Sequence, residues 1–231
     1  MPKEYLDLTQ LVSLKNAAKN GRDRLLIHLL ERLGCRVSEV LALKVDDIDF
    51  INAKVNIVHL KSHVWLTCKQ CNARLGLRHD FCPECGNKND LNLTQRSEKR
   101  RQRLLPMDSE TLDLISKYID SGGPVNKNGK MYLFGINRHR AWQIIRNCAR
   151  RAGLPSLVNP ETGRTRGVSP HRLRDAFAVH AMKVDDSGEG MRMLQEHLGH
   201  ASFNTTARYR KVASEEHQHW YNKLWKQEGE N

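Results

Sequence analysis

Apolar residues recur at helical spacing along much of the chain, and this pattern predicts a mainly helical protein. In GRDRLLIHLLERLG, residues 21–34, leucines fall three or four positions apart, and Gly34 is expected to end that helix. A helix is expected before it in LTQLVSLKNAAKN, with Thr9 as its N-cap. Further helices are expected at 109–121 with Asp108 as cap, at 137–152, at 171–184, at 191–198 and, last, in SEEHQHWYNKLWK at 214–226.

Alternating patterns predict a small sheet beside these helices. The segment RVSEVLALKVDDIDF reads as a short helix that runs into an extended stretch, and AKVNIVHLK alternates apolar and polar positions as a strand does. A second strand is expected in RSEKRRQRLLPMD, ending at Pro106, and YLFG as a short extended piece. The segments SGGPVNKNGK and LPSLVNPETGRTRGVSP are expected to be loops. The predicted fold class is therefore α+β, mainly α, over one domain of 1–231 with an inserted module at 64–92.

The charge balance points to a polyanionic partner. The 231 residues hold 38 Lys and Arg against 26 Asp and Glu, a formal net charge of +12. Arginines and lysines concentrate in RSEKRRQR and NRHRAWQIIRNCARR, where they would neutralise phosphates with little sequence information. Apolar runs stay shorter than the roughly 18 to 20 residues of a membrane span, and the N-terminus lacks the layout of a signal peptide. These features favour a cytoplasmic, DNA-associated protein.

Four of the six cysteines form a pattern typical of a structural zinc site. Cys68, Cys71, Cys82 and Cys85 follow C-x2-C-x10-C-x2-C, which presents four thiolates to one tetrahedral ion. The module has few large apolar residues and is expected to depend on one zinc ion for its fold. A closed site of four cysteines leaves no coordination position for water, so we expect no catalytic metal.

Three separated stretches carry residues suited to phosphate chemistry: CRVSEVLALKVDDID, SPHRLRDAFAVHA and LQEHLGHASFNTTARYRKV. Together they resemble the signatures of the tyrosine recombinase, or phage integrase (Xer-like), family, in order and in spacing. The family pattern places an arginine before Ser and Glu, then His-x-x-Arg, then Leu-Gly-His about two helical turns before a nucleophilic tyrosine. The matching positions here are Arg36, His171, Arg174, His200 and Tyr209.

The resemblance implies a metal-independent attack of Tyr209 on a DNA phosphodiester. Arg36 and Arg174 would stabilise the charge that builds on the phosphate oxygens. His200 would donate to the same phosphate, and His171 would take the tyrosine proton or donate to the phosphate.

A lysine in the hairpin after the first arginine has the role of general acid in this family. Lys61 is the best candidate, one residue later than the usual spacing, and Lys99 on the returning strand is the alternative. With Lys61, the zinc module would be an outgrowth of this hairpin and would lie beside the duplex.

The resemblance leaves several expectations open. Asp175 departs from the family, which tends to place a basic residue there, so a weakened or specialised site is one interpretation. The first motif comes too early for the usual N-terminal DNA-clamp domain, which is expected to be absent from this sequence, either because it is a fragment or because the enzyme is naturally short. In a naturally short enzyme, the zinc module would be a substitute grip on DNA. The C-terminal helix, with Trp220 and Leu224 four residues apart, is suited either to a neighbouring protomer in a homo-oligomer on DNA or to its own domain.

The predicted function is a site-specific DNA recombinase or integrase that cleaves and rejoins strands through a covalent 3′-phosphotyrosyl intermediate. The alternatives are a type IB topoisomerase-like nicking-closing enzyme and a catalytically weakened DNA-binding accessory protein.

Overall fold

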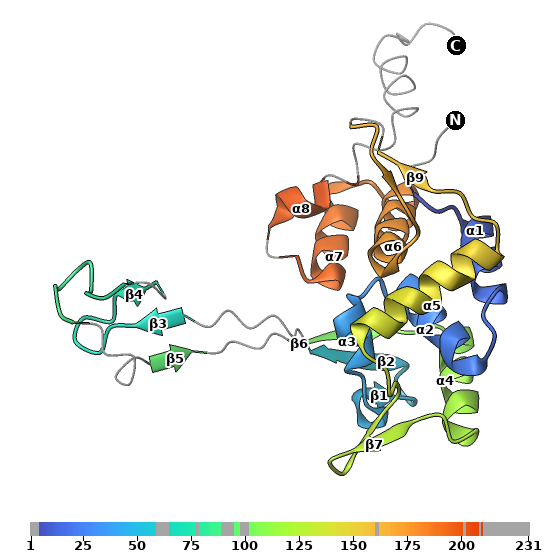
Figure 1. Cartoon of the computed structure of the whole chain (residues 1–231), viewed down its shortest axis with the longest axis horizontal. Helices are drawn as coiled ribbons and strands as arrows, with labels where there is room; N and C mark the ends of the chain where they lie inside the picture. The colour runs from blue at the N-terminus through green and yellow to red at the C-terminus, as the bar shows by residue number, and fades with distance from the viewer. Residues whose placement is uncertain are drawn as a thin grey trace, which may run out of the picture. The chain divides into compact units, whose positions relative to one another are not determined.

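Two compact units make up the chain in a computed structural model (Figure 1): the first draws on Met1–Ile57 and Arg103–Asn231, the second on Val58–Gln102. The structure describes residues 5–58, 65–76, 79–88, 95–97, 102–159, 162–200, 202–207 and 209. The predicted C-terminal helix, Lys61 and Lys99 lie outside these residues.

The first unit is mainly helical, and α2 forms its centre. Leucines and one isoleucine on α2 are almost wholly buried, and α2 packs against α4 and α6. The helices are α1 Leu8–Asn16, α2 Gly21–Leu33, α3 Val37–Leu41, α4 Ser109–Asp120, α5 Arg138–Arg151, α6 Pro170–Val184, α7 Gly188–Leu198 and α8 Phe203–Ala207, with a short 3-10 turn at Val45–Asp47. Among these helices, all within the described residues, none combines the length and the apolar character that a membrane span requires.

The helix ends follow the expected capping rules, with one correction. Asp7, not Thr9, is the N-cap of α1: its carboxylate accepts a hydrogen bond from the Gln10 backbone N–H at 2.8 Å, and the Gln10 side chain accepts one from the Asp7 backbone N–H at 3.1 Å. This reciprocal pair satisfies two helix-end groups, whereas a single Thr cap satisfies one. Gly34 ends α2 in the left-handed conformation, with φ of 56°. The ring of Phe177 lies only 2.5 Å from where a β-carbon on Gly34 would sit, so this turn requires glycine.

Three small sheets of the first unit are antiparallel hairpins or extensions of them. The largest has the order β1-β2-β6, formed by Ile48–Asp49, Lys54–Val58 and Gln102–Pro106. The other two are the hairpins β7 Val125–Lys127 with β8 Lys130–Tyr132, and β9 Leu157–Val158 with β10 Thr165–Arg166.

The strands β7, β9 and β10 lie in segments that the sequence predicts as loops, whereas β8 runs from the last residue of one such loop to Tyr132, the first residue of the segment YLFG that is predicted to be extended. Asn128 and Gly129 between β7 and β8 have φ of 52° and 76°, the two positive values that a tight Asn-Gly hairpin turn requires. The strands on either side are too short and too exposed to produce an alternating pattern, which is why the loop expectation was wrong.

The second unit contains a separate three-stranded sheet in the order β4-β3-β5, formed by Arg74–Leu75, Trp65–Thr67 and Gln95–Ser97. Along the chain, this sheet lies between β2 and β6, so the second unit is inserted in the connection between two neighbouring strands of the first unit's largest sheet. The architecture is α+β and mainly helical, as predicted.

Candidate active site and metal centre

Arg36 immediately precedes α3 and is held by a buried acid. The Glu39 carboxylate, 1% exposed, accepts hydrogen bonds from the Arg36 backbone N–H at 3.0 Å and from its Nη1 at 3.1 Å. The Arg36 side chain keeps 35% of its surface exposed. Glu39 therefore fixes the direction of a guanidinium that still reaches solvent.

Arg103 on β6 is a second partner of Glu39 that the sequence did not single out. Its Nη2 donates to Glu39 at 2.8 Å, and its Nε donates to the carbonyl of His197 at 2.8 Å. Burial, the largest single effect, would lower the pKa of Arg103, but the hydrogen bond to Glu39 together with the interactions with Cys35 and the charge of Glu39 outweighs burial and raises that pKa. The sequence pattern places Arg103 in the basic cluster RSEKRRQR, which is expected to bind DNA. A signal was present, because Arg103 is two residues before the buried Leu105 and so shares the inward face of the strand.

Arg174 on α6 is buried between the ends of two other helices. Its Nη1 donates to the Gly34 carbonyl at 2.7 Å and its Nη2 to the Leu198 carbonyl at 2.9 Å. These carbonyls end α2 and α7, where the helix dipole favours a cation. Burial, and next the nearby charge of Arg36, lower the pKa of Arg174 to about 10, so the side chain stays charged at neutral pH.

His197 and His200 flank the left-handed turn at Gly199, whose φ is 67°. The His197 ring stacks on Phe177, with centroids 4.8 Å apart, and its Nε2 lies 3.0 Å from the Leu33 carbonyl oxygen. Burial lowers the pKa of His197. It is therefore a neutral packing residue at neutral pH.

His200, the histidine of the Leu-Gly-His motif, contacts different residues from His197. Its Nδ1 lies 2.9 Å from the Thr206 hydroxyl, and its ring stacks on Tyr209 with centroids 6.4 Å apart. The turn at Gly199 thus separates a structural histidine from the one that meets the predicted nucleophile.

Tyr209, the predicted nucleophile, is 2% exposed and its hydroxyl donates to Asp175 Oδ1 at 2.8 Å. Asp175 is itself 2% exposed, and its other oxygen accepts from Arg172 Nη1 at 2.9 Å. His171 Nε2 lies 3.9 Å from Asp175 Oδ1, and the side chain of His171 is 60% exposed. The acid that departs from the family pattern is therefore the hydrogen-bond acceptor of the predicted nucleophile.

The five predicted motif residues within the described part of the chain thus gather in one region. Arg174 lies beside Arg36, Tyr209 stacks on His200, and His171 reaches the same carboxylate as Tyr209. Neither lysine proposed as general acid is among the described residues.

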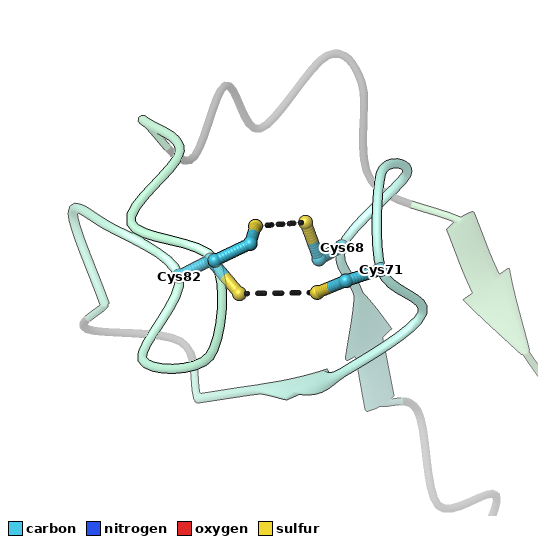
Figure 2. Close-up of side chains that lie close together, drawn as sticks. Cys68, Cys71 and Cys82 are labelled. Atoms are coloured by element: carbon cyan, nitrogen blue, oxygen red, sulfur yellow. Dashed lines mark hydrogen bonds between the residues drawn. The ribbon is translucent and has the colours of Figure 1, made fainter.

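The four cysteines of the second unit, Cys68, Cys71, Cys82 and Cys85, lie close together on two matching turns. Figure 2 shows Cys82 opposite Cys68 and Cys71. The Asn72 backbone N–H donates to the Cys68 carbonyl at 2.8 Å, and that of Gly86 to the Cys82 carbonyl at 3.0 Å. Asn72 and Gly86 both have positive φ, 57° and 71°, directly after the second cysteine of each pair. The chain therefore makes the same turn twice.

The sulfur positions fit a tetrahedral metal ion. All four sulfurs lie within 4.8 Å of one another, and the Cys68–Cys85 and Cys71–Cys82 sulfur pairs are 3.6 Å and 3.5 Å apart. Zn–S bonds of about 2.3 Å in tetrahedral geometry would separate sulfurs by about 3.8 Å. A disulfide needs about 2.05 Å, so the observed spacing suits a shared ion instead.

Solved structures with the same fold define the class to which this arrangement belongs. The XerA recombinase aligns with a TM-score of 0.62 and 21% identity over 96% of this chain and 63% of that one. The XerH site-specific recombinase, solved bound to a palindromic difH substrate, aligns with a TM-score of 0.59 and 19% identity over 95% of this chain and 52% of that one. The fold is that of the tyrosine recombinases.

The chain belongs to the phage integrase family, whose model matches residues 4–216. Tyrosine recombinase XerD of Mycobacterium tuberculosis is 28% identical over 197 residues, which cover 81% of this chain and 47% of that protein. A tyrosine recombinase of Pseudothermotoga lettingae is 28% identical over 215 residues, covering 91% of this chain and 57% of that protein. The chain spans about half the length of these relatives.

Proposed function

We propose that this chain carries the catalytic domain of a site-specific DNA recombinase or integrase. One observation supports this above all others: the motifs, which are separate in the sequence, bring Tyr209 and His200 into one region with Arg174 and Arg36, and Tyr209 is hydrogen-bonded to the residue after Arg174. A net charge of +12 favours DNA as the partner.

In the proposed reaction, Arg36 and Arg174 stabilise the charge on the non-bridging oxygens of the scissile phosphate. Both are fixed before substrate arrives, Arg36 by Glu39 and Arg174 by two backbone carbonyls. Preorganised donors of this kind lower the barrier because they need no rearrangement as charge develops.

The Tyr209 oxygen forms a bond to phosphorus, and the bond from phosphorus to the 5′-oxygen breaks. The product is a 3′-phosphotyrosine and a 5′-hydroxyl, and attack by a 5′-hydroxyl reverses the step. The proton of Tyr209 goes first to a base, and we propose His171 for this role, or Asp175, whose carboxylate accepts the Tyr209 hydroxyl in the free protein. Lys61, or else Lys99, protonates the departing 5′-oxygen.

Because the Tyr209 side chain is buried in the free protein, its hydroxyl must exchange Asp175 for the phosphate when DNA binds. Asp175 then marks a resting state rather than a lost activity. An acid at position 175, where the family tends to have a basic residue, would therefore keep the Tyr209 hydroxyl hydrogen-bonded until DNA is present.

For the second unit we propose one structural zinc ion bound by Cys68, Cys71, Cys82 and Cys85, with no catalytic metal. When bound, the ion would hold the two cysteine turns together in a unit with little apolar core. We also propose that this module grips DNA. Replacing Cys68 and Cys71 by serine should weaken DNA binding in zinc-replete buffer. An unchanged affinity for DNA in a variant that is still folded would contradict the proposal that this module binds DNA.

A homo-oligomer assembled on DNA through the C-terminal helix completes the proposal. That helix lies outside the described residues, so its support is the sequence pattern around Trp220 and Leu224.

The experiment for the central proposal is covalent capture. DNA sites are first obtained by selecting bound duplexes from a random pool, and a nicked suicide version of a selected site is then incubated with the protein. The wild type and a Tyr132→Phe control should give an SDS-resistant protein–DNA adduct, and Tyr209→Phe should give none. An absent adduct on a tightly bound site would favour a non-catalytic accessory protein, and relaxation of any supercoiled plasmid would favour a topoisomerase.

A further inference from the structure

A pocket rich in arginine lies beside the first turn of α6, outside the motif residues. It is lined by Leu157, Val158, Asn159, Arg164, Arg166 and Arg172. Three of these six described residues are arginines and none is acidic. Three arginines lining one small pocket concentrate positive charge there, which favours an anion as its ligand.

The β9–β10 hairpin gives this pocket a defined frame. Leu157 pairs with Arg166 across the two strands. The Asn159 carbonyl accepts from the Gly163 backbone N–H at 2.8 Å, and the Asn159 side chain accepts from the Thr162 N–H at 2.9 Å. The turn is therefore closed by its own hydrogen bonds, and Arg164 and Arg166 follow directly after it.

Arg172 connects the pocket to the predicted nucleophile. Its Nη1 donates to Asp175 at 2.9 Å, and Asp175 accepts the hydroxyl of Tyr209 at 2.8 Å. Within the described part of the chain, Asp175 is the one side chain to which Arg172 is hydrogen-bonded. A guanidinium has five N–H groups in a planar fork, so Arg172 has donors left for an anion in the pocket.

We propose that this pocket is a subsite for a DNA backbone phosphate other than the scissile one. The inference rests on the proposed function. Arg164 and Arg166 would neutralise the phosphate from the hairpin, and Arg172 would bind it from α6. Because His171 and Arg174 flank Arg172 on the same helix, a phosphate in this pocket would fix the strand relative to the residues proposed for the chemistry.

A DNA phosphate suits this pocket better than a protein carboxylate does. Both ligands offer two oxygens to a bidentate guanidinium group, but only a DNA phosphate has neighbouring phosphates along its strand that other cations of a chain with net charge +12 can also neutralise. Through Arg172, such a phosphate would also be linked to the carboxylate that holds Tyr209.

The test is the salt dependence of binding to a 30-base-pair duplex of arbitrary sequence, with the full chain. Each phosphate contact adds about 0.9 to the slope of log K against log salt concentration. The double variant Arg164→Ala with Arg166→Ala should lower the slope by about 0.9, which makes its loss of affinity between 50 and 200 mM salt about 3.5-fold smaller. Both side chains are exposed, so an unchanged thermal midpoint checks that the fold is intact.

A matched control removes the same charge elsewhere. Lys127→Ala with Lys130→Ala deletes two exposed cations from the β7–β8 hairpin and should leave the slope within about 0.2 of wild type. A wild-type slope in the arginine variant, or equal losses in both double variants, would overturn the subsite. If the arginine variant lowers the salt slope but the wild type gives no covalent Tyr209 adduct, the phosphate subsite is supported and the proposed recombinase function is overturned.

Discussion

Replacing Asp175 with alanine and Tyr209 with phenylalanine, singly and together, measures the contact that holds the predicted nucleophile. Both residues are 2% exposed, and the hydrogen bond joins a hydroxyl to a carboxylate at 2.8 Å. Hydrogen bonds to charged groups contribute about 1.5 to 3 kcal/mol to stability. Because the bond is out of contact with water, we expect the coupling free energy between the two substitutions to be about 2 kcal/mol.

The single variants should differ in their free energies of unfolding. Tyr209→Phe loses one hydrogen bond but leaves Asp175 paired with Arg172, so a loss of about 2 kcal/mol is expected. Asp175→Ala also removes the partner of Arg172, whose side chain is 16% exposed, and should lose about 3 kcal/mol. In the Asp175→Ala background, the further change Tyr209→Phe should have little effect, because the hydroxyl no longer has its acceptor.

The assay is urea unfolding followed by circular dichroism at the helix band, which reports the first unit because the described helices all belong to it. A control cycle pairs Tyr209→Phe with Asp113→Ala, an exposed residue on α4, and should give a coupling below about 0.5 kcal/mol. If the Asp175–Tyr209 cycle also falls below that value, the hydrogen bond is absent in solution and the resting state we propose is wrong.

Three further predictions concern other parts of the molecule. Arg103→Met should lower the free energy of unfolding by about 3 kcal/mol in the same urea assay, since it leaves the buried Glu39 with one guanidinium fewer; a loss no larger than that of exposed Lys54→Met would contradict this. Purified protein should contain one zinc ion per chain by atomic emission, and Cys71→Ser should contain much less; equal metal content in both would refute the site. Burial lowers the pKa of His28 from 6.5 to about 4, so between these pH values the unfolded chain binds a proton that the folded chain does not. Stability should therefore fall as pH drops from 6.5 towards 4, and urea titrations should show a smaller fall in His28→Gln; an equal fall would assign the effect to other groups.

The sequence predicted those features that local pattern determines. The leucine spacing of 21–34 predicted α2 and its end at Gly34, since a buried central helix repeats its apolar positions at the helical period. The paired cysteines predicted a cluster, because a CxxC turn orients its sulfurs locally. The order of the motifs indicated the family, although each residue alone had an ordinary structural explanation.

Contacts between segments that are far apart in the sequence could not be predicted from local patterns. Arg103 looked like one more basic residue in a basic run, and only the tertiary fold brings it to Glu39, 64 residues away. Asp175 was recognised as unusual, but its role as acceptor for Tyr209 depends on how the segment after α8 returns to α6. The cap of α1 was within reach of the sequence, since Asp7 and Gln10 have the spacing of a capping box.

Peptide mapping of the covalent adduct tests the central claim most directly. The wild-type protein is trapped on a suicide duplex, the DNA is trimmed by nuclease and the protein by trypsin, and the modified peptide is sequenced by mass spectrometry. We predict a 3′-linked nucleotide remnant on Tyr209 and unmodified Tyr5, Tyr118 and Tyr132. A remnant on any residue other than Tyr209, or a 5′-phosphate linkage, would contradict the account.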